Sequence, residues 1–416
     1  MTWLKRFLGE SPKQVLAWAF YDFANSSYYL IMLSFVFPIY FKEVVVGGSK
    51  GDFYWGLVLA VSILLGGLAA PIIGAIADYD NRKKPKFILF TLICIASTAI
   101  LYFSGPGKVL FSSIFFIIAS FSLALILPIY DSFLGWVSKK ENAGTVSGFA
   151  WGLGYMGGLA AVVLFKPFYG GGYAGSLDYL YRLTFPLTAV FFLVFSLPAF
   201  LYIVEFKRES RKESFYNLIK IGFKKTFTTL KNIREHSDVA WFLLGFYLFS
   251  DALGTLFAFM PIYARGTLKL SFLEITALLL VIQIIAFPAS ALAGFISDKM
   301  GSRRILITTL WVWAIIVGML AMAGSKSFFY LIAFLIALVI GSSQTIARSW
   351  LSKMVPPEKR FEFFGFNSFA SKIAATTGPV IFGTVSVLTN NQRWAVLSLL
   401  PFFVLSIIIF SRIKEG

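Results

Sequence analysis

Gly74-Ala-Ile-Ala-Asp78-Tyr-Asp-Asn-Arg82-Lys83-Lys84 is a charged turn between two apolar runs, and the chain contains it twice. The second copy reads Gly294-Phe-Ile-Ser-Asp298-Lys-Met-Gly-Ser-Arg303-Arg304. Short loops rich in Lys and Arg are typical of the cytoplasmic links between membrane-spanning helices. The two copies therefore predict a chain whose halves share one fold.

Composition favours a membrane protein over a soluble one. Of 416 residues, 58% are hydrophobic and 14% are charged, whereas soluble domains carry about 25% charged residues. The net charge of +17 is compatible with nucleic-acid binding, but the hydropathy argues against that partner. A single cysteine, Cys94, and a single histidine, His236, exclude a disulfide framework or a thiolate–imidazole metal site. We expect no metal and no cofactor.

Twelve apolar runs are long enough to cross a hydrocarbon layer of about 30 Å as helices, and in lipid such runs must satisfy their own backbone hydrogen bonds. We predict an all-α membrane protein in which these runs are transmembrane helices. They cover 15–41, 53–77, 87–104, 109–134, 144–165, 183–204, 239–263, 272–296, 305–323, 328–350, 361–388 and 394–411.

The positions of the basic residues predict the orientation. When both termini are placed in the cytosol, most of the 37 lysines and arginines fall on the cytosolic side, as the positive-inside rule requires. We expect a monomeric, multi-pass protein of a prokaryotic plasma membrane, and a vacuolar membrane is the alternative.

Two further matches support an internal duplication. Asp131-Ser-Phe-Leu134 resembles Arg348-Ser-Trp-Leu351, and Phe37-Pro-Ile-Tyr40 resembles Met260-Pro-Ile-Tyr263, at similar spacings and in the same helix order. Parallel six-helix repeats are known among transporters. We therefore predict an N-terminal bundle over 1–204, a basic amphipathic linker over 205–238 and a C-terminal bundle over 239–416. The linker is either an interfacial helix on the anionic leaflet or a plain tether.

The repeated Asp…Arg turn resembles the signature of the major facilitator superfamily. Two predicted helices narrow the resemblance to the vacuole effluxer family. The first contains Trp18-Ala-Phe-Tyr-Asp22-Phe-Ala-Asn25-Ser26, and the eleventh contains Glu362-Phe-Phe-Gly365-Phe…Lys372…Gly378-Pro379. The resemblance implies the major facilitator fold, and the fungal members of that family export amino acids from the vacuole during autophagy.

Ionisable residues within the predicted spans mark the candidate site, because each is costly in lipid and needs a partner or a use. Lys372 would hold an anionic group and Asp251 a cationic one, as suits a zwitterion; mutual neutralisation of the two is the open alternative. Asp22 or Asp251 would carry a coupling proton. The predicted substrate or proton site comprises Asp22, Asn25, Tyr28, Trp151, Tyr155, Asp251, Gln283 and Lys372.

A second set lies near the cytosolic helix ends. We expect Arg348 to pair with Asp298, and Arg82 or Lys83 to bridge Asp131 and Asp78. The predicted cytosolic gate comprises Asp78, Arg82, Lys83, Asp131, Asp298, Arg303, Arg304 and Arg348.

The sequence contains no Gly-x-x-x-x-Gly-Lys-[Ser/Thr] motif, so an ATP-driven pump of the usual kind is not expected. No nucleophile–base set or metal-ligand cluster points to an enzyme. We predict a secondary active transporter of a small polar solute, an amino acid by resemblance, with proton-coupled efflux as one form. The alternatives are another cargo (drug, sugar or peptide) or a channel, scramblase or receptor on the same fold.

Overall fold

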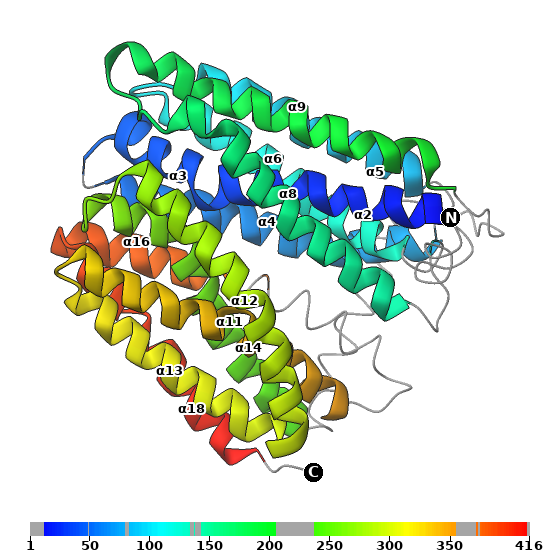
Figure 1. Ribbon diagram of the computed structural model, residues 1–416, viewed down its shortest axis with the longest axis vertical. Coiled ribbons are helices and arrows are strands. Elements are labelled where there is room, and N and C mark those ends of the chain that lie inside the picture. The colour runs from blue at the N-terminus through cyan, green and yellow to red at the C-terminus, as the bar shows by residue number, and fades with distance from the viewer. Residues whose placement is uncertain are drawn as a thin grey trace. The chain divides into compact units, whose positions relative to one another are not determined.

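The computed structural model describes residues 12–48, 50–79, 83–133, 137, 143–204, 237–354, 372 and 375–413. Within these ranges every regular element is a helix (Figure 1). The longer elements are α2 (Pro12–Ser27), η1 (Tyr28–Ser34), α3 (Val36–Tyr40), η2 (Phe41–Val46), α4 (Gly51–Tyr79), α5 (Lys83–Ile100), α6 (Val109–Ser132), α8 (Ala143–Tyr169), α9 (Asp178–Tyr202), α11 (Ser237–Gly266), α12 (Phe272–Met300), α13 (Ser302–Met322), α14 (Lys326–Met354), α16 (Thr377–Thr389), α17 (Gln392–Leu397) and α18 (Leu400–Arg412).

The helices have the length and polarity of membrane spans. Among the described residues, nine helical stretches are long and apolar enough to cross a bilayer, and two shorter apolar helices cover Phe272–Ala286 and Thr377–Thr389. The prediction of an all-helical, multi-pass membrane protein is confirmed at this level. Twelve spans and cytosolic termini remain predictions, and the linker predicted over 205–238 lies almost wholly outside the described residues.

Contacts divide the chain into two compact units. The first contains Met1–Gly47 and Leu68–Phe223, and the second contains Gly48–Gly67 and Lys224–Gly416. The start of α4 thus packs with elements that come much later in the sequence. The division into two six-helix bundles and a linker stays a prediction.

Among the described residues, three of the predicted helices are interrupted, and one of them is 394–411, where a turn at 398–399 separates α17 from α18. The range 15–41 contains α2, the π-helical η1 and α3, with a break at Phe35 (φ −127°, ψ −73°). In the range 361–388, α16 begins at Thr377 after a turn at 375–376. Pro38 and Pro379 each occupy the third position of the new helix. A proline has no N–H for the carbonyl four residues earlier, and its ring clashes with that carbonyl, which favours an interruption just before Pro38 and Pro379.

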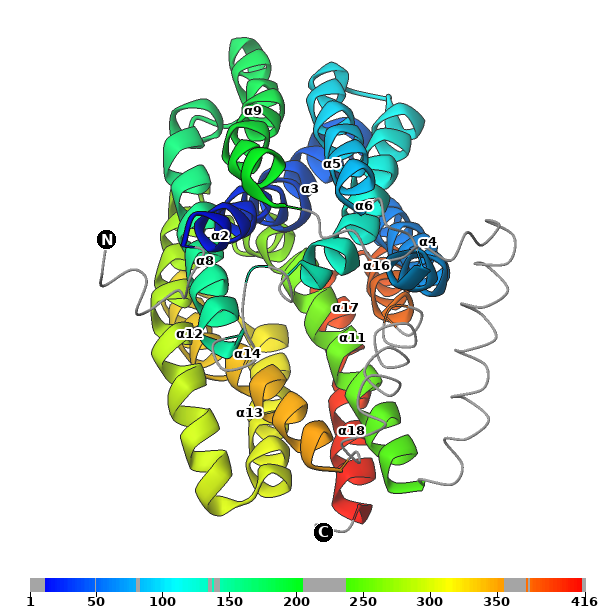
Figure 2. The same ribbon diagram turned by 90° about the vertical axis from the view of Figure 1, so that its right-hand side faces the viewer.

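In the first unit, α2 packs against α8 and α9, while α5 packs against α6 and α9 (Figure 2). Glycine allows the close approach of α2 and α8. A Cβ atom at Gly157 would lie 2.0 Å from the carbonyl oxygen of Phe23. Buried aromatic rings fill the remaining space, as in the stacked pair Phe37 and Phe116, whose centroids are 5.3 Å apart.

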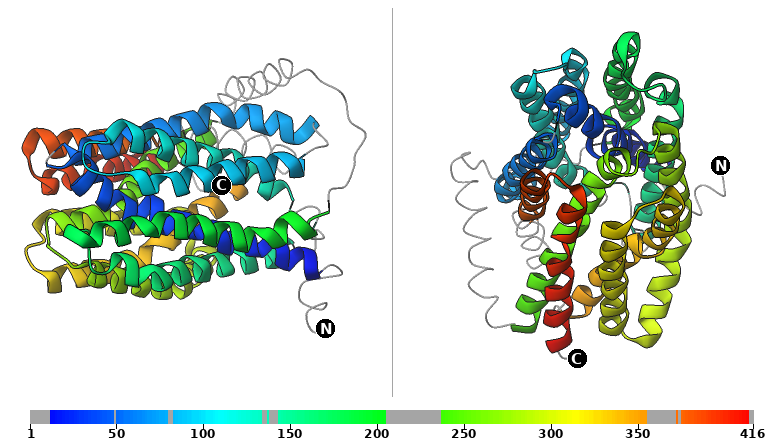
Figure 3. Two further views of the ribbon diagram at one scale, coloured as in Figure 1. Left: turned by 90° about the horizontal axis from the view of Figure 1, so that it is seen from above. Right: turned by 90° about the vertical axis from the view of Figure 1, so that its left-hand side faces the viewer.

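In the second unit, α12 packs against α14, and α18 packs against α11 and α13. The red helix α18 runs beside the light green α11 in the right-hand view of Figure 3. The buried Trp313 stacks on Phe403, and its indole N–H donates a 3.1 Å hydrogen bond to Ser343 Oγ. These contacts join α13, α14 and α18.

The buried carboxylate of Asp52 anchors the start of α4 in the second unit. It is 2% exposed. Its Oδ2 accepts hydrogen bonds from Ser386 Oγ at 2.6 Å and Gln392 Nε2 at 2.9 Å. Thr267 Oγ1 in turn donates to Gln392 Oε1 at 2.8 Å. The network ties α4 to α16, α17 and the end of α11.

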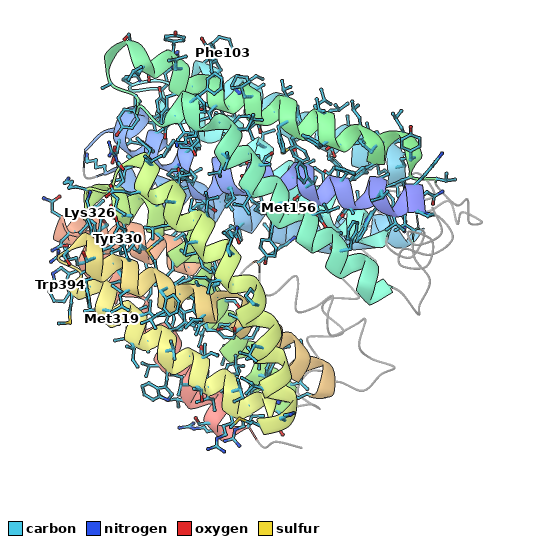
Figure 4. All side chains as sticks on the ribbon, in the orientation of Figure 1. Phe103, Met156, Met319, Lys326, Tyr330 and Trp394 are labelled. Carbon is cyan, nitrogen blue, oxygen red and sulfur yellow. The ribbon has the colours of Figure 1, made fainter. Side chains whose placement is uncertain are left out.

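One end of α12 is fixed by a capping box. Ser271 Oγ accepts from the Glu274 amide, and the Glu274 carboxylate accepts from the Ser271 amide, so two free backbone donors are satisfied together. Lys326 Nζ also lies 2.8 Å from Glu274 Oε1, and the Tyr330 hydroxyl donates to the same oxygen. Figure 4 shows Lys326 and Tyr330 at the same end of this unit.

Candidate functional site

The strongest candidate site surrounds Asp251, near the middle of α11. Its side chain is 2% exposed. Oδ2 accepts a 2.8 Å hydrogen bond from the amide of Gly378, whereas Oδ1 is buried without a hydrogen-bond partner. A buried polar atom without a partner costs roughly 1–3 kcal/mol, and more for a charged group. One oxygen of the carboxylate thus has a hydrogen-bond donor and the other has none.

The start of α16 shapes one side of this site. Because α16 begins at Thr377, the Gly378 amide belongs to its first turn, where backbone donors have no partner within the helix and the helix dipole favours a negative charge. Gly378 is needed for the approach. A Cβ atom there would lie 2.2 Å from Thr255 Oγ1 and 2.7 Å from Asp251 Oδ1.

Two more polar atoms on α11 are buried without a partner, Tyr247 Oη and Ser250 Oγ. Residues three and four apart share one face of a helix. Tyr247 precedes Ser250 by three residues and Asp251 by four, so Tyr247 shares a face with each of them, while Ser250 and Asp251 are adjacent. Gly254 continues that face, and a Cβ atom at Gly254 would meet nothing within 4 Å. This part of α11 therefore combines three buried, unsatisfied polar atoms with an open position at Gly254, within about two turns.

Lys372 and Gln283 complete the predicted residues of the second unit. Both are partly exposed, and Gln283 belongs to α12. The hydrogen-bond partner of the Asp251 carboxylate is the backbone of Gly378 and not the ammonium of Lys372. The binding of an anionic substrate group by Lys372 therefore stays a prediction.

A second polar cluster lies in the first unit, at the end of α2. Asn25 Nδ2 donates to Asp22 Oδ1 at 3.4 Å, and Ser26 Oγ donates to the Asp22 carbonyl at 2.8 Å. The π-helical η1 follows directly, and π-helical turns often occur at functional sites. A Cβ atom at Gly154 would lie 3.5 Å from Asp22 Cβ, so α8 flanks the cluster.

Hydrogen bonds between helices hold α2 and η1 in place. Trp18 Nε1 donates to the Tyr130 carbonyl, and the Tyr130 hydroxyl donates to the Trp18 carbonyl, while the two rings stack 4.8 Å apart. The Tyr28 hydroxyl shares a 2.8 Å hydrogen bond with Ser120 Oγ. Tyr28 is also fully buried, so its hydroxyl is both hydrogen-bonded and shielded, whereas Tyr155 is 40% exposed.

The structure gives only part of the predicted gate. Of the gate residues, Arg82 and the side chains of Asp78, Asp298 and Arg348 lie outside the described residues, as does the side chain of Trp151 from the predicted substrate site. Among the others, the Arg303 guanidinium donates to the carbonyls of Phe410 and Ser411 at the end of α18, as suits a cation at a helix C-terminus. Lys83 is partly exposed, and Asp131 and Arg304 are exposed. Their gate role stays a prediction.

The sequence reasoning missed Tyr247, Ser250 and Tyr130. The spacing offered a signal for the first two, since Tyr247 lies four residues before Asp251 and three before Ser250, and residues at those spacings share a face of the helix. Tyr130 carried no comparable signal, because its partner Trp18 is 112 positions away.

Solved structures share this fold. The nucleoside transporter NupG (D323A mutant) superposes with a TM-score of 0.75 at 14% identity, covering 97% of this chain and 99% of that one. The inward-open xylose transporter XylE from E. coli gives a TM-score of 0.66 at 14% identity, covering 97% and 95%. At such identity the likeness shows the fold alone.

Sequence relatives point the same way. An MFS-type transporter of Bacillus subtilis, YxiO, is 28% identical and covers 99% of this chain and 96% of its own. Autophagy-related protein 22 of Yarrowia lipolytica is 24% identical and covers 66% and 51%, and that of Kluyveromyces lactis is 24% identical and covers 47% and 42%. The chain thus spans about half the length of these fungal relatives or less.

The apolar helices and these relatives define a multi-pass membrane transporter of the major facilitator type. The Major Facilitator Superfamily model matches residues 3–162. The model described as "Vacuole effluxer Atg22 like" matches residues 137–415, more than half of the chain. The chain belongs to this vacuole effluxer family, which confirms the resemblance seen in the sequence.

Proposed function

We propose that this protein is a secondary active transporter that exports an amino acid by alternating access. Asp251 would bind the ammonium group of the substrate and Lys372 its carboxylate. Asp22 would carry a coupling proton, with Asn25, Tyr28, Trp151, Tyr155 and Gln283 as further contacts.

The observation that carries the proposal is the buried, half-satisfied carboxylate of Asp251. Its Oδ2 is held by the Gly378 amide, while Oδ1 has no hydrogen-bond partner. Ionisable groups at membrane depth are rare and mark substrate or ion pathways by default. A cationic group on the substrate would satisfy Oδ1 and offset its desolvation.

The break before α16 supports the same site. In many transporters, substrate and ion sites are formed where membrane helices are discontinuous. Here the discontinuity at 375–376 places the first turn of α16 at Asp251. Lys372 precedes that break by a few residues, so a positive and a negative side chain belong to neighbouring parts of the second unit.

We further propose that the termini face the cytosol of a prokaryotic cell and that the chain works as a monomer in its plasma membrane. The excess of basic residues on one side of the predicted topology supports the orientation. The relative that covers nearly the whole chain comes from Bacillus subtilis. Reporter fusions at each terminus test the orientation.

Uptake into proteoliposomes tests the transport proposal. Labelled amino acids, a nucleoside and xylose are offered separately, with and without a pH gradient, to liposomes with and without the protein. Saturable amino-acid uptake that responds to the gradient is expected. Uptake of the nucleoside or the sugar in place of amino acids would contradict the substrate class, and large ionic currents would favour a channel.

A further inference from the structure

Three buried polar atoms without hydrogen-bond partners lie on one face of α11. They are the hydroxyl oxygens of Tyr247 and Ser250 and the Oδ1 atom of Asp251. Tyr247 lies three residues before Ser250 and four before Asp251, so the three residues fall within about one turn of the helix. A single such atom is a minor defect, whereas three neighbouring ones, one of them on a carboxylate, indicate a place where a ligand binds.

Ser250 is one of three helical Ser or Thr residues, with Thr184 and Ser196 on α9, whose hydroxyls are buried without a partner among the described residues, and only Ser250 adjoins a buried carboxylate that is also short of a partner. Buried Ser and Thr hydroxyls commonly donate to the carbonyl four residues earlier, as Ser62 does to Val58, Thr255 to Asp251 and Ser343 to Val339, at 2.8–3.0 Å. The Ser250 hydroxyl has no such bond. It therefore keeps its hydrogen-bonding capacity for another group.

The chemistry of the three atoms indicates what that group is. A carboxylate oxygen accepts hydrogen bonds, and a hydroxyl oxygen can accept them as well. A primary ammonium has three N–H donors, and each must find an acceptor when the cation leaves water. Three acceptors on one helical face match that number. Hard cations such as Ca²⁺ prefer six or more oxygen ligands, which this face does not offer.

We propose that Tyr247, Ser250 and Asp251 form an ammonium cradle that selects primary amines over methylated ones. The inference rests on the proposed function insofar as the substrate is an amino acid. It goes further by naming two additional binding residues and a rule of selectivity. Each methyl group on nitrogen replaces one N–H and leaves one buried acceptor unpaired, which weakens binding by roughly tenfold.

A cysteine at Gly254 provides a direct test, because this position lies one turn beyond Asp251 and has open space around it. The single native cysteine is removed as Cys94→Ala, and the rate at which a maleimide labels Gly254→Cys is measured in the full-length protein. Methylammonium, dimethylammonium, trimethylammonium and tetramethylammonium are the probes. Gly318→Cys is the matched control, since position 318 on α13 is equally open.

Methylammonium should slow labelling at 254 but not at 318, with the concentration for half protection rising about tenfold for each added methyl group. Asp251→Asn should abolish the protection, and Ser250→Ala or Tyr247→Phe should weaken it. Equal protection by all four probes, or none, would overturn the cradle. Thermal stabilisation of the unsubstituted protein by the same probes provides a second readout, because a ligand that binds the folded state raises Tm.

Failure of the ammonium cradle and failure of the amino-acid transport proposal give different experimental results. Protection by methylammonium in a protein that transports no amino acid would uphold the cradle and refute the substrate. Amino-acid uptake that N-methylated amino acids inhibit as well as the parent compounds would uphold the transport proposal and refute the cradle.

Discussion

The backbone amide of Gly378 donates a 2.8 Å hydrogen bond to Oδ2 of Asp251, although the two residues are 127 positions apart in the sequence. The contact brings the first turn of α16 to a buried carboxylate near the middle of α11. It orients the carboxylate and leaves its second oxygen without a partner. The proposed substrate site depends on this relationship.

Gly378→Ala should disturb that contact. The new Cβ atom would lie 2.2 Å from Thr255 Oγ1 and 2.7 Å from Asp251 Oδ1, so these side chains must rotate or α16 and α11 must separate, at a cost of about 1–3 kcal/mol. We expect a lower Tm in detergent and loss of substrate transport. Gly318→Ala, where the Cβ meets nothing within 4 Å, is the control and should leave Tm unchanged or slightly raised. Equal Tm values for both variants would show that the contact is not tight.

Ser386→Ala should destabilise the second unit by removing a hydrogen bond to the buried Asp52 carboxylate. A hydrogen bond to a charged group contributes about 1.5–3 kcal/mol. The matched control is Ser196→Ala on α9, because Ser196 Oγ is buried without a partner and its removal should be neutral or stabilising. Thermal unfolding of both variants measures the difference, and a Ser386→Ala variant as stable as the wild type would contradict the role of Asp52.

Gly157→Ala should loosen the packing of α2 on α8. A Cβ atom at this position would lie 2.0 Å from the backbone oxygen of Phe23, and backbone yields less readily than a side chain. The expected cost is about 1–3 kcal/mol, read as a lower Tm. Gly152→Ala on the same helix meets nothing within 4 Å and serves as control; a drop of similar size there would assign the effect to helix α8 in general.

If Asp22 carries the coupling proton, Asp22→Asn should abolish the accumulation of substrate that a pH gradient drives and should leave the exchange of substrate intact. An amide cannot take up and release the proton, yet it keeps the size of the side chain and the contact with Asn25. We expect exchange of internal for external amino acid to persist in proteoliposomes, while accumulation driven by a pH gradient is lost. Gradient-driven accumulation at the wild-type level would assign the coupling elsewhere.

The fold could be predicted from the sequence because its signals are local. Apolar length and the repeated charged turn at Asp78 and Asp298 report on neighbouring residues only, and the family comparisons agree with them. The helix breaks at Phe35 and 375–376 were harder to predict. Pro261 and Pro288 lie within the continuous helices α11 and α12, so a proline does not by itself predict an interruption.

The site was predictable only in part. The charge of Asp251 in an apolar run marks it as costly, and hence as a candidate, from the sequence alone. Its bond to Gly378 and the burial of Tyr247 and Ser250 depend on how distant helices pack. The sequence carried no signal for the Asp52 network either, since Ser386 and Gln392 are 334 and 340 positions away.

The most direct test of the account compares Asp251→Asn with Asp238→Asn in proteoliposomes that exchange labelled amino acid. Both changes replace a carboxylate by an amide on α11, but Asp238 is exposed in its first turn. Asp251→Asn should lose saturable exchange, Lys372→Ala should lose it as well, and Asp238→Asn should keep the wild-type rate. Wild-type exchange by Asp251→Asn would contradict the assignment of this carboxylate to the substrate.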